Sequence, residues 1–117
     1  MSEAVRILHN PRCSKSRQTL ALLDKHGLEP EIIEYLKTPP DQQTLETLLQ
    51  QLGCAAADIV RFNEPEFAAT GLSKDADDAA LLRAIVEYPK LLQRPIVVHG
   101  EAARIGRPPE AVLELFE

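Results

Sequence analysis

A single cysteine lies at the point where a short apolar run gives way to a helical pattern. Residues 5–8 (Val-Arg-Ile-Leu) are typical of a strand, residues 19–23 (Thr-Leu-Ala-Leu-Leu) are typical of a helix, and Cys13 lies in the polar segment between them. The backbone N–H groups at a helix N-terminus have no partner within the helix, so they favour a thiolate over a thiol. Because a lowered pKa makes a cysteine nucleophilic at neutral pH, this junction predicts a redox or thiol-transfer site.

Cys13 lacks the second cysteine that would close a local disulfide. The motif is Cys-Ser-Lys-Ser, so Ser16 stands where a resolving thiol would be. An outside thiol such as glutathione is therefore needed to complete a turnover. A buried structural role is the alternative for Cys13, but its neighbours are polar. Cys54 follows a predicted helix end and precedes three alanines, and we interpret it as a structural residue.

The composition fits one domain spanning residues 1–117, because 44% hydrophobic residues in 117 can form one core. A net charge of −5 and few aromatic residues argue against nucleic acid as a partner. No apolar run could span a bilayer and no secretory signal precedes the first strand, so we expect a cytoplasmic protein without membrane contact. The three histidines lack ligand spacing with the cysteines, so no metal site is predicted. We expect a monomer.

The order of the predicted elements indicates an α/β, thioredoxin-like fold. The first helix ends near His26-Gly27, and a second strand follows at residues 31–36, which predicts a parallel strand–helix–strand unit. Residues 94–98 and 103–105 predict a hairpin of two further strands. A final helix opens at residues 107–109. Together these elements predict a mixed four-stranded sheet.

An inserted helical region is predicted between the second and third strands, at residues 38–92. Its first helix follows two prolines, with Thr38 or Asp41 as the N-cap, and Gly53 ends it. Further helical segments are expected at residues 58–61, 64–69 and 77–88.

Three arginines lie at or next to the ends of predicted elements. Arg61 ends a short apolar helix, Arg94 precedes the proline that opens the third strand, and Arg107 precedes Pro108-Pro109. Each alone reads as a surface charge. In a thioredoxin plan, however, the residue beside the third-strand proline faces the active cysteine. We therefore expect Arg94 and Arg107 to point toward Cys13, where guanidinium groups would bind a tetrahedral oxyanion.

Two polar residues near Cys13 each have two interpretations. Ser16 either donates its hydroxyl to the thiolate or is an ordinary residue of the first helical turn. His9 either lowers the thiol pKa as a protonated neighbour or only fixes the loop at the end of the strand. Asn10 is expected to hold the loop through side-chain hydrogen bonds to the backbone.

Taken in order, the motifs resemble the ArsC family of glutaredoxin-related arsenate reductases, in particular a shorter subgroup of it. The matching segments are His-Asn-Pro-x-Cys-x-x-Ser-Arg from His9, Tyr-Leu-x-Thr-Pro-Pro from Tyr35, Arg-x-Asn-Glu-Pro from Arg61, Arg-Pro-Ile-Val-Val from Arg94, and Arg-Pro from Arg107. The resemblance implies a thioredoxin-like fold with an inserted helical region. It also implies reduction of arsenate to arsenite with glutathione as co-substrate, glutaredoxin as partner and no tightly bound cofactor.

The resemblance also implies roles for individual residues. Cys13 would be the nucleophile that attacks arsenic. The other implied roles are oxyanion binding for Arg61, Arg94 and Arg107, support of the thiolate for His9 and Ser16, and a cis-proline beside the thiol for Pro95.

Two other functions stay open at this point. A glutathione-dependent thiol-disulfide reductase with a different substrate would use the same cysteine, although it would not require three arginines. A redox-responsive transcription regulator like Spx, which binds RNA polymerase, shares the fold. Its switch is a Cys-x-x-Cys pair, and Ser16 takes the second position here.

Overall fold

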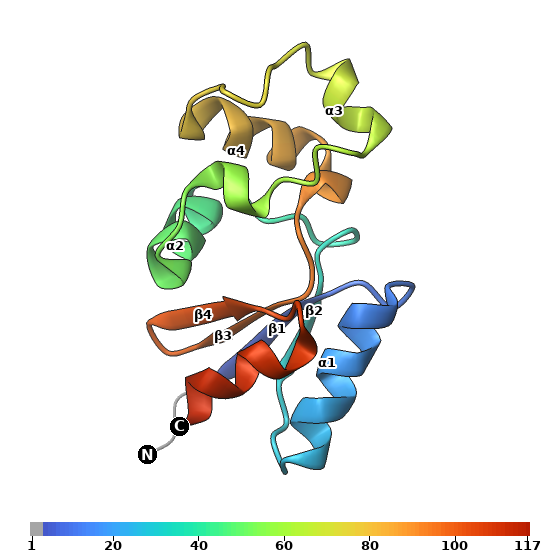
Figure 1. Cartoon of the computed structure of the whole chain (residues 1–117), viewed down its shortest axis with the longest axis vertical. Coiled ribbons are helices and arrows are strands. Elements are labelled where there is room, and N and C mark those ends of the chain that lie inside the picture. Colours follow the sequence, from blue (N-terminus) through green and yellow to red (C-terminus); the bar gives the residue numbers. More distant parts are fainter. Residues whose placement is uncertain (1–3) are drawn as a thin grey trace. The chain divides into compact units, whose positions relative to one another are not determined.

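The computed structural model describes residues 4–117 and contains a four-stranded sheet with the strand order β2-β1-β3-β4 (Figure 1). β1 is parallel to β2 and antiparallel to β3, and β3 is antiparallel to β4. This confirms the predicted mixed sheet and its hairpin. The strands are β1 (Val5–His9), β2 (Glu31–Glu34), β3 (Ile96–His99) and β4 (Ala102–Ile105).

The helices fall into two kinds. The α-helices are α1 (Ser14–Lys25), α2 (Gln42–Leu52), α3 (Pro65–Ala69) and α4 (Asp78–Glu87). Three further segments are 3₁₀-helices, at Ala56–Ile59, Pro89–Leu91 and Pro109–Phe116. The final helix was predicted without its type, and the structure makes it a 3₁₀-helix that starts at a proline. No described helix is long and apolar enough to cross a membrane.

The chain groups into two compact units. The sheet unit contains the chain up to Thr38 together with Arg94–Glu117, and the helical unit contains Pro39–Gln93. The helical unit coincides closely with the insertion predicted at residues 38–92.

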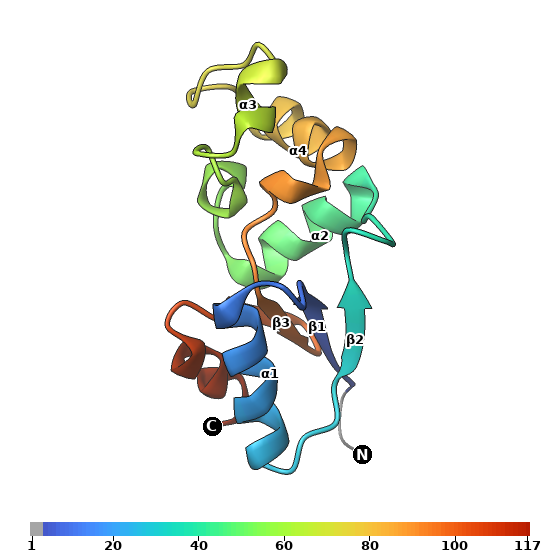
Figure 2. The same cartoon turned by 90° about the vertical axis from the view of Figure 1, so that its right-hand side faces the viewer.

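In the sheet unit, α1 and the C-terminal 3₁₀-helix lie side by side (Figures 1 and 2). Leu23 of α1 and Val112 of the 3₁₀-helix are fully buried against Ile7 and Val97 of the two central strands. β1 is hydrogen-bonded to β2 on one side and to β3 on the other, and its Ile7 and Leu8 side chains are buried. Removing one such side chain costs about 2–5 kcal/mol of stability. This packing holds α1, whose N-cap is the cysteine, against the sheet.

Within the helical unit, α2 begins at a side-chain cap and ends at a glycine. The Asp41 carboxylate accepts a hydrogen bond of 2.8 Å from the Thr44 N–H, so Asp41 and not Thr38 is the N-cap of α2. Gly53 ends α2 in the left-handed conformation, as predicted. The core of the unit consists of fully buried apolar side chains, including Leu45, Leu81, Ile85 and Leu91.

Two strand boundaries differ from the prediction by two residues, and the others agree to within one residue. β2 ends at Glu34 rather than at residue 36, because the carbonyl of Glu34 accepts hydrogen bonds from the N–H groups of Lys37 and Thr38 and the chain turns. β3 begins at Ile96 rather than at Arg94, because Pro95 has no N–H to donate to a neighbouring strand.

Candidate active site

Cys13 is the N-cap residue of α1, directly after the loop that leaves β1. Its N–H donates to the carbonyl of Asn10 at 3.0 Å, and its own carbonyl accepts the first helical hydrogen bond from the N–H of Arg17. The side chain is half-buried, so solvent reaches the thiol. These observations confirm the predicted position at a helix N-terminus.

The surroundings of Cys13 lower the pKa of its thiol below the ordinary value. Burial by itself raises this pKa and is the largest single influence. Hydrogen bonds from the backbone of Ser16, the side chain of Arg94 and the backbone of Lys15, together with the positive charge of Arg94, outweigh it. The helix N-terminus and one arginine thus provide the thiolate stabilisation that the sequence predicts.

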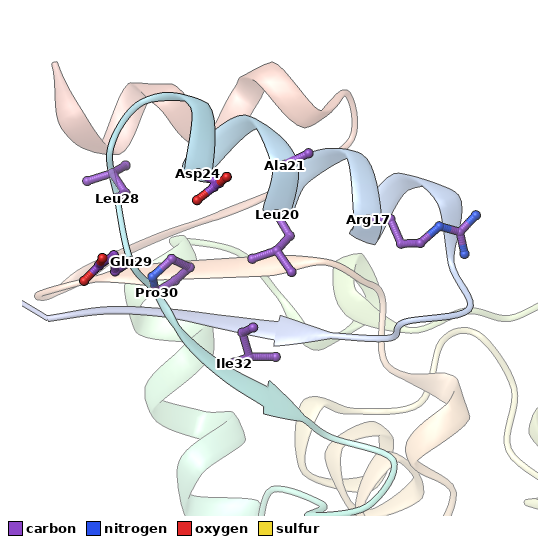
Figure 3. Close-up of a pocket in the computed structure, with 8 residues that line it drawn as sticks. All are labelled: Arg17, Leu20, Ala21, Asp24, Leu28, Glu29, Pro30 and Ile32. Atoms are coloured by element: carbon purple, nitrogen blue, oxygen red, sulfur yellow. The ribbon is translucent and has the colours of Figure 1, made fainter.

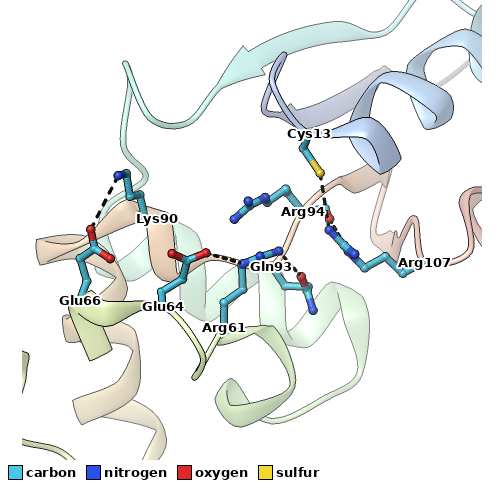
Figure 4. Close-up of polar contacts among 8 residues, drawn as sticks. All are labelled: Cys13, Arg61, Glu64, Glu66, Lys90, Gln93, Arg94 and Arg107. Carbon is cyan, nitrogen blue, oxygen red and sulfur yellow. Dashed lines mark hydrogen bonds and ion pairs between the residues drawn. The ribbon is translucent and has the colours of Figure 1, made fainter. Parts of the chain in front are cut away.

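Arg107 is hydrogen-bonded to the sulfur of Cys13. Its Nη2 donates to Cys13 Sγ at 3.5 Å, and its Nε donates to the backbone carbonyl of Arg94 at 2.8 Å (Figure 4). The second bond fixes the plane of an otherwise exposed guanidinium. Arg94 and Arg107 therefore both reach Cys13, as expected from their places beside Pro95 and β4.

His9 and Ser16 form a buried pair beneath the loop. Ser16 Oγ accepts from the Asn10 N–H at 3.0 Å and lies 2.7 Å from His9 Nδ1. Burial, the largest influence, lowers the pKa of His9; the carboxylate of Glu34 opposes this and the charge of Arg17 adds to it. In a neutral His9, Nδ1 either accepts a hydrogen bond from the Ser16 hydroxyl or donates one to it, according to the tautomer.

The hydrogen bond between His9 and Ser16 decides between the two interpretations of each residue. The Ser16 hydroxyl is engaged by a neutral His9, so it is the backbone N–H of Ser16 that stabilises the Cys13 thiolate. The lowered pKa of His9 also argues against a protonated neighbour of the thiol. The geometry thus favours the second interpretation of His9, as a residue that fixes the loop.

Further hydrogen bonds hold the loop between β1 and α1. The Asn10 side chain accepts from the Arg12 N–H at 3.0 Å, which confirms its expected role. Arg17 Nη1 donates to the carbonyl of Pro11 at 2.9 Å. No sequence signal indicates this contact of Arg17, because a bond to a residue six positions earlier follows no local pattern.

Gly106 is a second residue whose role has no signal in the local sequence. A Cβ atom at this position would lie 2.6 Å from Thr19 Oγ1 and 2.8 Å from Pro95 Cγ. The Gly106 N–H also donates to the Pro95 carbonyl at 2.9 Å. The absence of a side chain therefore lets the segment that carries Arg107 pass close to Pro95. The peptide bonds before Pro95 and Pro108 are both cis, which confirms the expectation for Pro95.

Arg61, the third arginine singled out, belongs to the helical unit. Its Nε donates to Glu64 Oε1 at 3.2 Å and its Nη1 to Gln93 Oε1 at 3.5 Å. The signal for the first contact is the three-residue spacing within the Arg-x-Asn-Glu motif. The contact with Gln93 joins distant segments and has no signal in the sequence.

Cys54 contrasts with Cys13. It follows the end of α2 and is half-buried. Burial raises its thiol pKa, and the nearby carboxylates of Asp58 and Asp78 raise it further. A thiol with a raised pKa is a poor nucleophile at neutral pH, in agreement with a structural role. Among residues 4–117, no three His, Cys, Asp or Glu side chains gather in a way that could hold a metal ion.

A groove lies between α1 and β2, and Cys13 is not among the residues that line it. Leu20 and Ala21 line it from α1, and Ile32 lines it from β2 (Figure 3). Arg17 stands at one end of it, next to the loop. The lining is mostly apolar and contains no nucleophile.

Comparisons with known proteins agree with this geometry. An uncharacterized protein of Escherichia coli strain K12, YfgD, is 50% identical over 117 residues, covering 98% of each chain. An arsenate reductase of Neisseria meningitidis serogroup A is 44% identical over 110 residues, covering 92% of this chain and 94% of that protein. The solved structure of an arsenate reductase from Vibrio cholerae matches with a TM-score of 0.92 and 46% identity, covering 98% of this chain and 99% of that one.

The model of the ArsC family matches residues 8–115, which include the Cys13 loop, the Arg61 motif and both arginines beside the thiol. The match thus spans nearly the whole chain, and the fold of the sheet unit is the one that the family resemblance implied. This protein is a member of the ArsC family.

Proposed function

We propose that this protein is an arsenate reductase, in which the Cys13 thiolate attacks arsenate and glutathione and glutaredoxin supply the electrons. The observation that carries the proposal is the contact of 3.5 Å between Arg107 Nη2 and Cys13 Sγ. A nucleophile with a lowered pKa thus lies within hydrogen-bonding distance of a group that can bind an anion. The arsenate reductases among its relatives support the choice of oxyanion.

Binding of arsenate would use the groups already directed at the sulfur. Arsenate is a tetrahedral dianion at neutral pH, and it would accept hydrogen bonds from the first turn of α1 and from the guanidinium groups of Arg94 and Arg107. Arg61 would supply the third guanidinium, a role that comes from the family resemblance. Because Arg107 is anchored on the Arg94 carbonyl, its donors are oriented before the anion arrives.

The first chemical step would form a bond between sulfur and arsenic. The Cys13 thiolate attacks As(V), and the arsenate hydroxyl takes up a second proton from solvent and leaves as water. The product is a covalent thiol–arsenate adduct in which arsenic is still As(V). The arginines stabilise the negative charge on the oxygens during this exchange.

The second step would transfer two electrons. A glutathione thiolate attacks the Cys13 sulfur, a disulfide forms between them, and the electron pair of the sulfur–arsenic bond stays on arsenic as As(III). Arsenite leaves. A glutaredoxin thiolate then attacks the glutathione sulfur of this disulfide and regenerates Cys13. Glutathione is a co-substrate in this scheme, which needs no tightly bound cofactor, and a reducing cytoplasm would maintain it.

His9, Ser16 and Pro95 would act as positioning residues. The buried His9–Ser16 pair holds the first turn of α1, whose Ser16 N–H stabilises the thiolate. Pro95 follows the carbonyl on which Arg107 is anchored and packs where a side chain at Gly106 would stand.

A coupled assay tests the proposal. Purified protein is mixed with arsenate, glutathione, glutaredoxin, glutathione reductase and NADPH, and NADPH oxidation is followed beside Cys13→Ser. Arsenate-dependent oxidation that disappears in the variant is the expected result. If no arsenate-dependent rate appears while Cys13 is still rapidly glutathionylated, the protein is instead a thiol-disulfide reductase with another substrate.

A further inference from the structure

The Arg61 guanidinium is held on two of its three nitrogens by side chains of the helical unit. Nε donates to Glu64 Oε1 at 3.2 Å, and Nη1 donates to Gln93 Oε1 at 3.5 Å (Figure 4). Among the described residues, none accepts a hydrogen bond from Nη2. The two contacts therefore define one orientation of the group and leave one edge available.

The backbone on both sides of this cluster is also fixed. Val60 and Leu92 form an antiparallel bridge and are both buried. The Arg61 N–H donates to the Leu91 carbonyl at 2.7 Å, on one side of that bridge. The Gln93 N–H donates to the carbonyl of Ile59 at 2.8 Å, on the other side. Arg61 and Gln93 thus start from a common, rigid piece of backbone.

The Glu64 side chain does not cap the helix that follows it. It is the N-cap residue of α3, and an N-cap side chain commonly accepts a hydrogen bond from the first turn of its helix. The Glu64 side chain makes no such bond and pairs with Arg61. Its N–H also donates to the Arg61 carbonyl at 3.2 Å, which keeps the two residues in one turn.

The charge of Glu64 would oppose a function in binding anions unless its orienting effect outweighs it. The two side chains are 27% and 24% exposed, so their ion pair is only partly screened by solvent. A carboxylate at Nε cancels the charge that would attract an oxyanion, yet it holds the plane of the guanidinium. Arg61 is then suited to donate a directed hydrogen bond rather than to act as a free cation.

We infer that Glu64 and Gln93 are positioning residues that hold the Arg61 guanidinium with its Nη2 edge available for arsenate. The inference rests on the proposed function, in which Arg61 binds the oxyanion. Glu64 works through its oxygen acceptor and its geometry, and its negative charge weakens anion binding.

Two substitutions at the same position separate these effects. Glu64→Ala removes the acceptor and releases the guanidinium, so the KM for arsenate rises about tenfold while kcat stays near the wild-type value. Glu64→Gln keeps an oxygen acceptor and removes the charge, so the KM equals or falls below that of the wild type. Equal increases in KM for both variants, or no change in either, would overturn the inference. Gln93→Ala is expected to raise the KM in the same direction as Glu64→Ala, and by less.

Glu114 provides a matched control. It pairs with Arg104 Nε at the same distance, 3.2 Å, at an exposed place in the sheet unit. Glu114→Ala should leave the KM for arsenate unchanged. If it raises the KM as much as Glu64→Ala does, the effect of Glu64 is a general loss of an ion pair and the inference is wrong.

A double substitution shows whether Glu64 acts through Arg61. In the Arg61→Ala background, Glu64→Ala should cause no further increase in KM, because the group that it positions is gone. A further increase of about tenfold, as in the wild-type background, would overturn the inference. If Arg61→Ala alone leaves the KM unchanged, it is the proposed role of Arg61 in binding arsenate that fails.

Discussion

Arg107 Nη2 lies 3.5 Å from Cys13 Sγ, although 94 positions separate the two residues in the chain. The contact depends on a second bond, from Arg107 Nε to the Arg94 carbonyl, which sets the direction of the guanidinium. The two arginines affect the thiol differently. Arg94 lowers its pKa through a hydrogen bond and its charge, whereas Arg107 is exposed and oriented by the backbone of Arg94.

Substitutions of the two arginines should therefore differ in effect. Arg94→Ala should raise the pKa of the Cys13 thiol, because it removes a hydrogen bond and a positive charge from the thiolate. Arg107→Ala should change this pKa less, but it should raise the KM for arsenate about tenfold or more. The rate of Cys13 alkylation against pH measures the first effect, and steady-state kinetics measure the second.

Arg104→Ala is the control for both measurements, because this arginine pairs with Glu114 on the surface. It should leave the alkylation profile and the KM unchanged. An Arg107 variant with wild-type kinetics would contradict the assignment of this arginine to oxyanion binding.

The two cysteines should differ in reactivity and in their importance for turnover. The pKa of Cys13 is lowered and that of Cys54 is raised, so at pH 7 iodoacetamide should label Cys13 much faster. Cys13→Ser should abolish arsenate reduction, and Cys54→Ser should leave it largely intact. Peptide mapping by mass spectrometry after timed labelling gives the two rates. Loss of turnover in a folded Cys54→Ser variant would show that this thiol takes part in the reaction.

Gly106→Ala should disturb the site through packing alone. The added Cβ would lie 2.6 Å from Thr19 Oγ1 and 2.8 Å from Pro95 Cγ, so the segment that carries Arg107 must shift. We expect the free energy of unfolding to fall by about 1–3 kcal/mol, which a lower melting temperature reports. We also expect a clear loss of kcat/KM. Gly71→Ala is the control. It strains a left-handed glycine with open space around it, so it should lower stability without affecting activity.

The buried His9–Ser16 pair should make stability depend on pH. The pKa of His9 is lower in the folded protein than in the unfolded chain, where it is about 6.5. The contribution of His9 to the free energy of unfolding is therefore complete above about pH 6.5. That contribution is lost as the pH falls through the folded pKa, because the unfolded chain then binds the proton more readily. Melting temperatures between pH 7.5 and pH 4.5 should fall less steeply in His9→Gln than in the wild type.

Much of this arrangement could be predicted from local patterns. Cys13 at the start of α1 follows from an apolar strand, a polar loop and a helical pattern in succession, because backbone N–H groups at a helix start are always available. The hairpin of β3 and β4 follows from two short apolar runs around a glycine turn. These features depend on residues close together in the sequence.

The remaining features depend on contacts between distant segments. The Arg107 anchor on the Arg94 carbonyl and the close approach of Gly106 to Thr19 arise only when β4 and α1 pack in the folded sheet unit. The role of Ser16 could not be decided from the sequence for the same reason, because its hydroxyl partner is a histidine from the preceding strand. Propensity and spacing do not encode such contacts.

The most direct test of the account is protection of Cys13 from alkylation by arsenate. In the absence of glutathione, increasing arsenate should slow iodoacetamide labelling of Cys13 in a saturable way, because the anion covers the sulfur and is attacked by it. The protection should weaken strongly in Arg107→Ala and should not occur at Cys54. If arsenate leaves the labelling rate of Cys13 unchanged at every concentration, the oxyanion does not bind at this thiol and the proposed arsenate chemistry is wrong.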